Sequence, residues 1–479
     1  MRVVSILCGL LILASCSSPK PLKKAEVITA YSMLAPSSQG DTLIYIRAII
    51  PGIHTKHQVC PVLESESGER SQMRIRGLHP GDNFPVTVCE ATAKAGIAYM
   101  VGGTELKFDA ITLNPKYIQV YGDSGCKAHV CNGNGPAEPF KTLITEGAKR
   151  DVDLILHMGD YNYRGTSGSI SKGVYAYDAG DGGYGGKTCG LEETYYSQNA
   201  QGSPKPDTWR AWRADFFSAA EAILTKAPWV FARGNHELCS RAGLGWFYFF
   251  GPGSELKEGI VQSACPAQGD FAQPLSSAVS AITMIDPYML KLDKHNIWVQ
   301  DSANACDDRF SNALTAQYQS QYESLQKFAS KYPNKPIWTV THRPLWGVNN
   351  VATDNTLNIM LQRALADTPL GRLPEQVTLA LSGHMHIYQS LSFDKQYRRP
   401  PQIVVGNSGV SLSEELPYTS FEAVIDGLEA NGNEQAKFGF LELELDRYSG
   451  WYGRFFDQQG EAFLRCDSQF AARDEQVCQ

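Results

Sequence analysis

Residues 234–237 read Gly-Asn-His-Glu and come two residues after the apolar segment Trp229–Phe231. Taken alone, Asn235 would most often be a helix N-cap that follows a strand. The tetrapeptide is much rarer than its parts, since residue frequencies give it by chance on the order of once in several hundred chains of this length. It therefore indicates a functional loop at the carboxyl end of a strand, which is where α/β domains collect ligands.

Four further apolar segments end in potential metal ligands. Taken singly, each ending has an ordinary interpretation, because Gly and Asp favour turns and a lone histidine is usually a hydrogen-bonded loop residue. Two histidines two positions apart would point to opposite faces of a regular strand. In this order, and each after an apolar strand, the five endings together predict a single site. The other four are Gly122-Asp123-Ser124-Gly125, Gly159-Asp160-Tyr161-Asn162-Tyr163, Thr341-His342-Arg343-Pro344 and Gly383-His384-Met385-His386.

Apolar strands alternate with helix-like segments over residues 116–455, which predicts an α/β catalytic domain. Helices are expected at Pro139–Arg150 and around Trp209–Ile223, and Gly165–Gly190 has the composition of a long loop. The expected strands are Tyr117–Tyr121, Asp153–His157, Trp229–Phe231, Ile297–Gln300, Ile337–Thr341, Thr378–Leu381 and Gln402–Val405.

Residues 36–114 have a different pattern, with short alternating segments separated by Pro, Gly and Asp turns. This predicts a small all-β domain that ends near Asn114-Pro115. Residues 456–479 are expected to form a Cys-containing C-terminal tail. The expected strands of the β domain are Thr42–Ile50, Met73–Arg76, Phe84–Glu90 and Ile97–Val101.

The composition excludes several classes of protein. The 479 residues are 43% hydrophobic and 19% charged, which is typical of a globular chain of two or three domains and not of a disordered one. The net charge is −7 and there is no long basic run, so no nucleic-acid binding is expected.

The N-terminus reads MRVVSILCGLLILASC and predicts export. Its apolar run is too short to span a bilayer but has the length of a signal-peptide core. Leu13-Ala14-Ser15-Cys16 resembles the lipobox of bacterial lipoproteins, which implies a signal peptide over 1–15, lipidation of Cys16 and a tether over 16–35. An ordinary secretory signal is the alternative. Ser17 favours the outer membrane, so we expect a lipid-anchored, periplasm-facing protein of the bacterial cell envelope.

Ten cysteines remain after Cys8 leaves with the signal and Cys16 takes lipid. An even number in an exported chain, with no C-x-x-C pair, favours disulfides over a zinc site. Sequence does not determine their connectivity, and neighbour pairing is a hypothesis. It gives Cys60–Cys89, Cys126–Cys131 and Cys466–Cys478, with Cys189–Cys239 and Cys265–Cys306 less secure.

The five motifs resemble those of the calcineurin-like metallophosphoesterases, and within them the purple acid phosphatase branch, over roughly residues 116–450. Most of the superfamily begins Asp-x-His, whereas the third place here is Gly125. Tyr163, three residues after Asp160, stands where purple acid phosphatases place a tyrosinate on the same metal. One departure is that Val340 lies two residues before His342 instead of three. The resemblance implies a layered β-sandwich flanked by helices.

The resemblance also implies a site with two metal ions. Three anionic oxygens and one imidazole suit Fe(III), whereas two imidazoles, an amide oxygen and a carboxylate suit Fe(II), Zn(II) or Mn(II). The first metal would be held by Asp123, Asp160, Tyr163 and His386, and the second by Asp160, Asn235, His342 and His384.

Two further residues have implied roles beside the metals. His236 resembles the superfamily's non-ligand histidine, which contacts the phosphate and donates a proton to the leaving group. Arg343 is a candidate for a forked contact with phosphate oxygens, with a plain surface arginine as the alternative.

These features predict an exported phosphoesterase that hydrolyses small phosphate esters, foremost phosphomonoesters, by attack of a metal-activated hydroxide. A phosphodiesterase or nucleotidase with the same site is the alternative among enzymes. A non-catalytic, metal-binding surface lipoprotein is the alternative from another class, and it would be expected to have lost a ligand. In a further non-enzyme reading, the β domain has the binding role and the phosphoesterase domain is anchored beside it.

Overall fold

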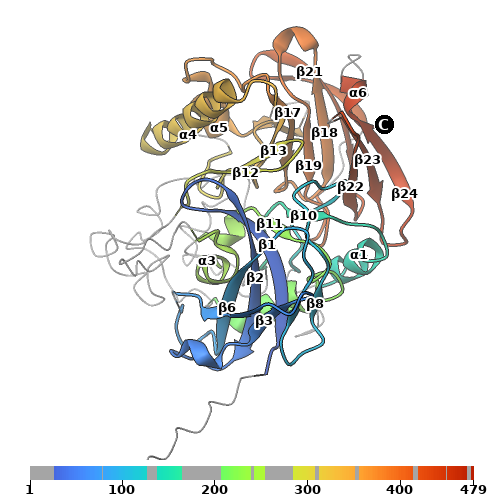
Figure 1. Ribbon diagram of the computed structural model, residues 1–479. Coiled ribbons are helices and arrows are strands. Elements are labelled where there is room, and N and C mark those ends of the chain that lie inside the picture. Colours follow the sequence, from blue (N-terminus) through green and yellow to red (C-terminus); the bar gives the residue numbers. More distant parts are fainter. Residues whose placement is uncertain are drawn as a thin grey trace, which may run out of the picture.

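Two large sheets contain most of the strands of the protein, as the computed structural model shows (Figure 1). The structure describes residues 26–77, 79–126, 137–163, 207–238, 242–253, 284–307, 312–350, 355–413, 419–448, 450–471 and 476–479. Everything said below concerns these residues.

The first sheet has ten strands, and its centre is formed by three parallel strands that bring their carboxyl ends to one edge. These are β9, β10 and β11, where the sequence predicted strands. In order the sheet is β24 (Ala462–Asp467), β23 (Trp451–Phe456), β22 (Phe440–Leu445), β9 (Tyr117–Tyr121), β10 (Leu154–His157), β11 (Trp229–Phe231), β1 (Thr29–Pro36), β2 (Thr42–Pro51), β6 (Val86–Ala93) and β5 (Arg74–Ile75).

The second sheet has eight strands, of which β13, β14, β17 and β19 run parallel to one another. Their carboxyl ends therefore also share one edge. In order the sheet is β12 (Tyr288–Lys291), β13 (Asn296–Val299), β14 (Ile337–Val340), β17 (Val377–Ser382), β19 (Gln402–Val405), β18 (Tyr388–Phe393), β21 (Leu428–Gln435) and β20 (Ser420–Ile425).

The two sheets share one buried hydrophobic cluster, in which Val120 and Leu156 of the first sheet belong with Val340 and Leu381 of the second. All four come from apolar strands without alternation, as expected for strands covered on both faces. The predicted layered β-sandwich flanked by helices is confirmed.

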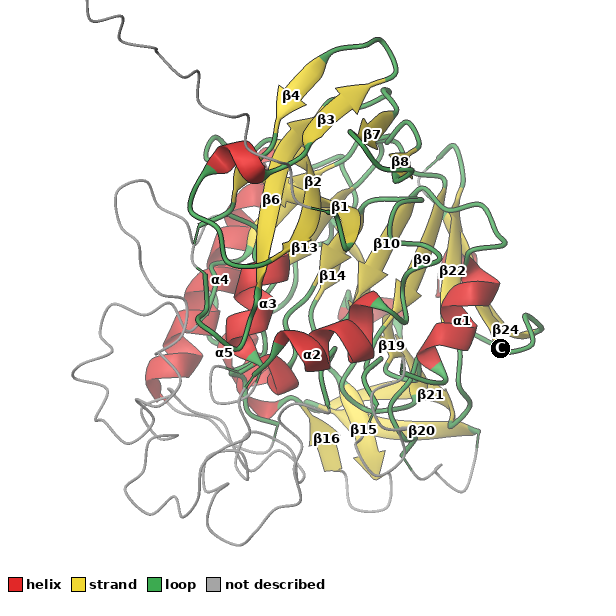
Figure 2. Ribbon diagram, turned by 90° about the horizontal axis from the view of Figure 1, so that it is seen from below, coloured by secondary structure: helices red, strands yellow, loops and turns green. Residues whose placement is uncertain are grey.

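Helices cover the outside of the sandwich. A second cluster packs α4 (Asn312–Lys331) and α5 (Ile359–Ala366) against the second sheet, and α1 (Phe140–Gly147) lies beside the opposite end of the molecule (Figure 2). The helix expected near Trp209 is short, because α2 (Trp209–Trp212) passes into one π-helical turn. The remaining elements are α3 (Gly243–Phe250), α6 (Ser468–Ala471) and the hairpin of β15 (Gly347–Asn350) and β16 (Asn355–Leu357).

The N-terminal region is all-β but does not begin where the sequence predicted. Residues 29–35, expected in the tether, belong to β1, which is buried along most of its length and pairs with β11 of the catalytic region. Because both faces are covered, its sequence lacks the alternation that marks a half-exposed strand. A four-stranded sheet with its own small core completes the region, in the order β4 (Arg70–Gln72), β3 (Val62–Ser65), β7 (Tyr99–Val101) and β8 (Lys107–Phe108).

The C-terminal residues are not a tail as predicted. Residues 462–467 form β24, which pairs with β23 at the edge of the first sheet. The Cys466–Cys478 disulfide fastens the last residues of the chain to this strand. The rings of Phe455 and Phe463 contact each other and bring the segment against the core. Its sequence pattern alone did not indicate this packing.

Two of the predicted disulfides are confirmed, namely Cys60–Cys89 and Cys466–Cys478. Cys126 and Cys306 are also disulfide-bonded, and their predicted partners lie outside the described residues. So do Cys189 and Cys239, the loop Gly165–Gly190, Cys16 and the signal segment, which stay predictions. Among the described residues, no helix is both long and apolar enough to cross a membrane.

Candidate metal centre

All seven predicted metal ligands lie at the edge where the parallel strands of both sheets end. Asp123 follows β9, Asp160 follows β10 and Asn235 follows β11, while His342 follows β14 and the two histidines of the last motif follow β17. Two groups of potential ligand atoms form there, each with its atoms within 4.8 Å of one another. The groups are Asp123, Asp160 and His386, and Asp160, His342 and His384, so Asp160 belongs to both.

The first group meets at the hydroxyl of Tyr163. This oxygen lies 2.9 Å from Asp160 Oδ2, 3.2 Å from Asp123 Oδ1 and 3.1 Å from His386 Nε2. Tyr163 and both aspartates are almost completely buried, and His386 is the most exposed member. Three oxygens and one imidazole nitrogen therefore point at the same small volume.

The second group meets at the amide oxygen of Asn235. This oxygen lies 2.9 Å from His342 Nε2 and 2.9 Å from His384 Nδ1. His342 Nε2 also lies 3.4 Å from Asp160 Oδ1, whereas its Nδ1 is 2.7 Å from the carbonyl oxygen of Met158. The ring of His342 therefore donates to a carbonyl through Nδ1 and keeps the lone pair of Nε2 for the site.

Four ligands have a left-handed backbone that non-glycine residues rarely adopt. Their φ angles are 53° at Asp123, 58° at Asp160, 78° at His384 and 52° at His386. Such conformations cost of order 1–3 kcal/mol each and persist where the surrounding structure enforces them, often at functional sites. In this way the turn after each strand aims its side chain back over the sheet edge.

The electrostatics of the site match a place for cations. Burial raises the pKa of Asp123 well above its usual value, and the charge of Asp160 raises it further. Burial also opposes ionisation of Asp160, but His342 and His236 outweigh it and lower its pKa. Burial and the two carboxylates raise the pKa of Tyr163. Without a bound cation, the two carboxyl groups and the phenol do not all ionise together. This set of oxygen donors fits hard metal ions.

Gly125 stands where most of the superfamily has a ligand histidine, and the structure shows why a side chain does not fit there. A Cβ atom on Gly125 would lie 2.5 Å from the carbonyl oxygen of Tyr161 and 2.5 Å from the ring carbon Cδ2 of Tyr163. The Tyr163 ring therefore occupies the space that a residue at position 125 would need. The backbone of Tyr161 and the ring of Tyr163 together leave no room for a side chain at 125.

Residues 118–388 match the family model of the calcineurin-like phosphoesterases. The chain belongs to this family. Among solved structures it is similar to a purple acid phosphatase from yellow lupin (Lupinus luteus) seeds, with 16% identity and a TM-score of 0.49 over 90% of this chain and 73% of that one. It is also similar to PhoD, with 11% identity and a TM-score of 0.49 over 94% and 92% of the two chains. No curated protein matches.

As a calcineurin-like phosphoesterase, the chain is a metal-dependent hydrolase of phosphoric esters, and its family implies a dinuclear metal site. The two ligand groups that share Asp160 are the candidates for that site. The predicted ligands are therefore brought together as a set.

His236 lies beside the centre of the phosphoesterase and in neither ligand group. Its backbone N–H donates to Asp160 Oδ1 at 2.8 Å, and its Nε2 is 4.0 Å from Asp160 Oδ2. Its ring packs on that of Tyr163 with 3.8 Å between centroids. The imidazole is thus held next to the metals without being a ligand.

Arg343 does not face the site as a phosphate contact would require, and it is not a surface arginine. It is completely buried, and its Nη1 lies 2.5 Å from Asp307 Oδ2 and 3.1 Å from His384 Nε2. The guanidinium pairs with Asp307, and the same carboxylate oxygen contacts Nε2 of His384, the ring nitrogen that points away from Asn235. The predicted forked contact with phosphate has no support here.

Two buried carboxylates of the phosphoesterase were not predicted as site residues. Glu237 accepts hydrogen bonds from the backbone N–H groups of Asp160, Tyr161, Asn162 and Gly234 at 2.8–3.2 Å, which holds the loop of the shared ligand. The signal for it was its place in Gly-Asn-His-Glu. Asp307 carried no such signal, because residues 301–307 contain no motif.

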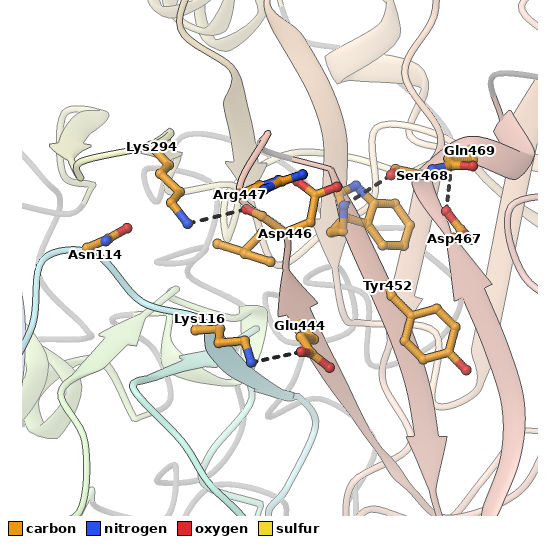
Figure 3. A pocket seen from close by; sticks show the side chains of 12 residues that line it. Asn114, Lys116, Lys294, Glu444, Asp446, Arg447, Tyr452, Asp467, Ser468 and Gln469 are labelled. Atoms are coloured by element: carbon orange, nitrogen blue, oxygen red, sulfur yellow. Dashed lines mark hydrogen bonds and ion pairs between the residues drawn. The ribbon is translucent and has the colours of Figure 1, made fainter.

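A cavity of about 590 Å³ lies away from this centre and contains none of the ligands (Figure 3). Its lining includes Lys116 and Lys294, which precede β9 and β13, so it lies at the amino ends of these strands. Both lysines have partners in Figure 3, with Lys116 on Glu444 at 3.0 Å and Lys294 on the carbonyl oxygen of Asp446. Nothing there marks a second catalytic site.

Proposed function

We propose that this phosphoesterase hydrolyses phosphomonoesters at a purple acid phosphatase-like centre of Fe(III) and a divalent metal. The observation that carries the proposal is the position of Tyr163, whose hydroxyl meets Asp123, Asp160 and His386 while its ring fills the place of a residue-125 side chain. Without a cation, burial and the two carboxylates raise the pKa of this phenol and keep it neutral, whereas a trivalent cation among the same donors would favour the phenolate and bind it.

Asp123, Asp160, Tyr163 and His386 would hold Fe(III), because they offer three anionic oxygens and one nitrogen. Asp160, Asn235, His342 and His384 would hold Fe(II), Zn(II) or Mn(II). When bound, two such cations activate water and stabilise the charge of an in-line phosphoryl displacement.

The side chain of His236 has the remaining role. Its backbone N–H donates to Asp160 and its ring packs on that of Tyr163, which keeps the imidazole beside the first group. From there it would bind a phosphate oxygen and donate a proton to the leaving alcohol, which removes the need to expel an alkoxide. His157 also lies near the centre, but its ring nitrogens face Ser124 Oγ at 2.8 Å and the backbone N–H of Gly159 at 3.2 Å.

Export is part of the proposal. The Cys60–Cys89 and Cys466–Cys478 disulfides support it, because such bonds persist in oxidising compartments. Lipidation of Cys16 would then anchor the enzyme at the bacterial cell envelope, with its site open to small phosphate esters.

Hydrolysis of para-nitrophenyl phosphate and of its bis ester, measured together with metal content, tests the substrate class. The proposal expects two metals per chain and a clear preference for the monoester. A preference for the bis ester would make the enzyme a phosphodiesterase. Two bound metals without any turnover would favour the metal-binding lipoprotein.

The metal assignment has a visible readout. Tyrosinate bound to Fe(III) absorbs in the visible through charge transfer, so iron-loaded, oxidised protein should be violet and Tyr163→Phe should be pale. Colourless wild-type protein with stoichiometric iron would place the enzyme outside the purple branch.

Lipid anchoring is tested by Cys16→Ser. The variant should stay unprocessed or leave the membrane fraction, because stable anchoring needs the lipid chains on this residue. Equal membrane retention of both proteins would remove the lipoprotein assignment.

A further inference from the structure

Residues 301–307, Asp-Ser-Ala-Asn-Ala-Cys-Asp, form the turn after β13 and lie next to the second metal group. Four of their side chains make buried hydrogen bonds to residues of that group or to their neighbours, namely Asp301, Ser302, Asn304 and Asp307. We call this segment the support loop.

Ser302 holds the chain at His342. Its Oγ accepts the backbone N–H of His342 at 3.0 Å and that of Arg343 at 2.8 Å. These two donors stand at the end of β14, where the ladder of the sheet no longer supplies an acceptor. Ser302 therefore fixes the direction in which His342 leaves the strand.

Asp301 holds the segment that contains Asn235. Its Oδ2 accepts from Nη1 of Arg233 at 3.0 Å, and both side chains are completely buried. The Nε of Arg233 donates to the carbonyl oxygen of Glu237 at 2.8 Å. One guanidinium thus joins both flanks of Asn235 to the support loop.

Asp307 holds the ring of His384. Its Oδ2 lies 2.8 Å from His384 Nε2, and the opposite ring nitrogen, Nδ1, faces Asn235. Its Oδ1 accepts from Asn358 at 2.8 Å and Arg343 neutralises its charge, so the carboxylate has a fixed orientation. A neutral imidazole that donates from Nε2 leaves the lone pair of Nδ1 for a metal.

We propose that the support loop is the scaffold of the second metal site, and that Asp307 is a positioning residue that fixes the ring and tautomer of His384. The inference rests on the proposed function, because it needs a metal in the second group. It adds a residue that touches neither substrate nor metal and acts through His384.

The first metal group lacks this arrangement. Its donors Asp123, Tyr163 and His386 contact one another directly and make no described hydrogen bond to residues 301–307. A defect in Asp307 should therefore affect the second metal and spare the first.

The test uses full-length protein loaded with iron and zinc, with iron in the first site and zinc in the second. Asp307→Asn should lose zinc about 10–100-fold more readily to a chelator, which is the usual cost of losing the partner of a ligand histidine. Iron content should stay at one per chain. Zinc loss at the wild-type rate, or equal loss of both metals, would overturn the proposal.

Asp307→Asn also leaves the buried charge of Arg343 without its partner, which can unfold a protein. The double variant Asp307→Asn, Arg343→Met removes both charges together and should show the same selective loss of zinc. Retention of zinc by a folded double variant would overturn the proposal.

Leu63→Ala is the matched control for general destabilisation, because Leu63 is buried in the separate core of the N-terminal region. It should lower the melting temperature and keep both metals. Wild-type protein that binds no second metal would overturn the proposed function and this inference with it. If wild type binds both metals and Asp307→Asn retains zinc as wild type does, the inference alone is overturned.

Discussion

The two metal groups of this phosphoesterase are built in different ways. In both groups the ligand atoms contact one another, but three of the four residues of the first have a left-handed backbone, against two of the four in the second. In the second, Asn235, His342 and His384 are each connected to the support loop through Arg233, Ser302 and Asp307. Turns of the main chain therefore contribute more to the geometry of the first site, and side-chain hydrogen bonds to the support loop are particular to the second.

This difference predicts which of the two metal sites is more easily disturbed by a substitution. Main-chain turns locked between two sheets move only when the fold moves, whereas a hydrogen-bonded side chain is released by one substitution. The first group also concentrates the negative charge, with two carboxylates and a phenol against one shared carboxylate in the second. We therefore expect the second metal to be the weaker and more exchangeable one.

The largest effect is expected for substitution of Asp160, the residue that both metal groups share. Asp160→Ala removes a ligand from each metal, so metal content should fall for both and hydrolysis should be abolished. Elemental analysis and turnover of para-nitrophenyl phosphate measure this. If two metals and near-normal turnover remained, the assignment of a shared ligand would be wrong.

His236 belongs to neither group, and its substitution separates chemistry from metal binding. His236→Ala should lower kcat by about 10²–10⁴-fold, the usual range for a lost general acid, and leave both metals in place. Steady-state kinetics and metal analysis on the same sample decide this. Loss of metal would identify a ligand, and an unchanged rate would identify a structural residue.

Gly125→Ala should damage the first group alone, as the counterpart of Asp307→Asn. The added Cβ would meet Tyr163 at 2.5 Å, and strain of this kind costs about 1–3 kcal/mol. If it is relieved by moving Tyr163, iron binding should weaken by about 10–100-fold, while zinc in the second site stays. Unchanged iron affinity and colour would mean that the Tyr163 ring tolerates a side chain at 125.

The smallest effects concern the metal-free protein, where the two groups should respond oppositely to pH. Burial raises the pKa of Asp123, so its contribution to stability is present below about pH 4 and is lost as pH rises. Burial lowers the pKa of His384, so its contribution is present above about pH 6.5 and is lost as pH falls. Each slope is at most about 1.4 kcal/mol per pH unit.

Denaturant unfolding of metal-free wild type, Asp123→Asn and His384→Gln between pH 4 and 8 measures these slopes. Asp123→Asn should lack the part of the free energy of unfolding that falls as pH rises in wild type. His384→Gln should lack the part that increases as pH rises. Parallel curves for all three proteins would contradict both assignments.

Sequence reasoning predicted the centre of the fold and the residues that gather at its edge because both depend on local pattern. Tyr117–Tyr121, Trp229–Phe231 and Gln402–Val405 are strands with the predicted bounds, since short apolar runs that end in Gly-x motifs have few alternatives. The ligands follow such runs directly, and parallel strands bring their ends together.

The remainder could not be predicted because it depends on contacts between distant segments. Asp307 has no motif, and its role arises only when the ends of β13 and β17 meet in space. Arg343 was next to a ligand in sequence, but the orientation of its side chain away from the site is set by Asp307. β1 and β24 were missed because their burial comes from partners elsewhere in the chain.

The position of β1 has a consequence for how the chain folds. Met33 pairs with Trp229, so β1 completes its pairing only after β11, which lies much later in the chain, has been synthesised. Until then β1 has a free, apolar edge, which is a template for association with other chains. Such long-range pairing also slows folding. The strand next to the Asn235 turn thus makes assembly of the centre a late event and gives the newly synthesised chain a period in which it needs protection from aggregation.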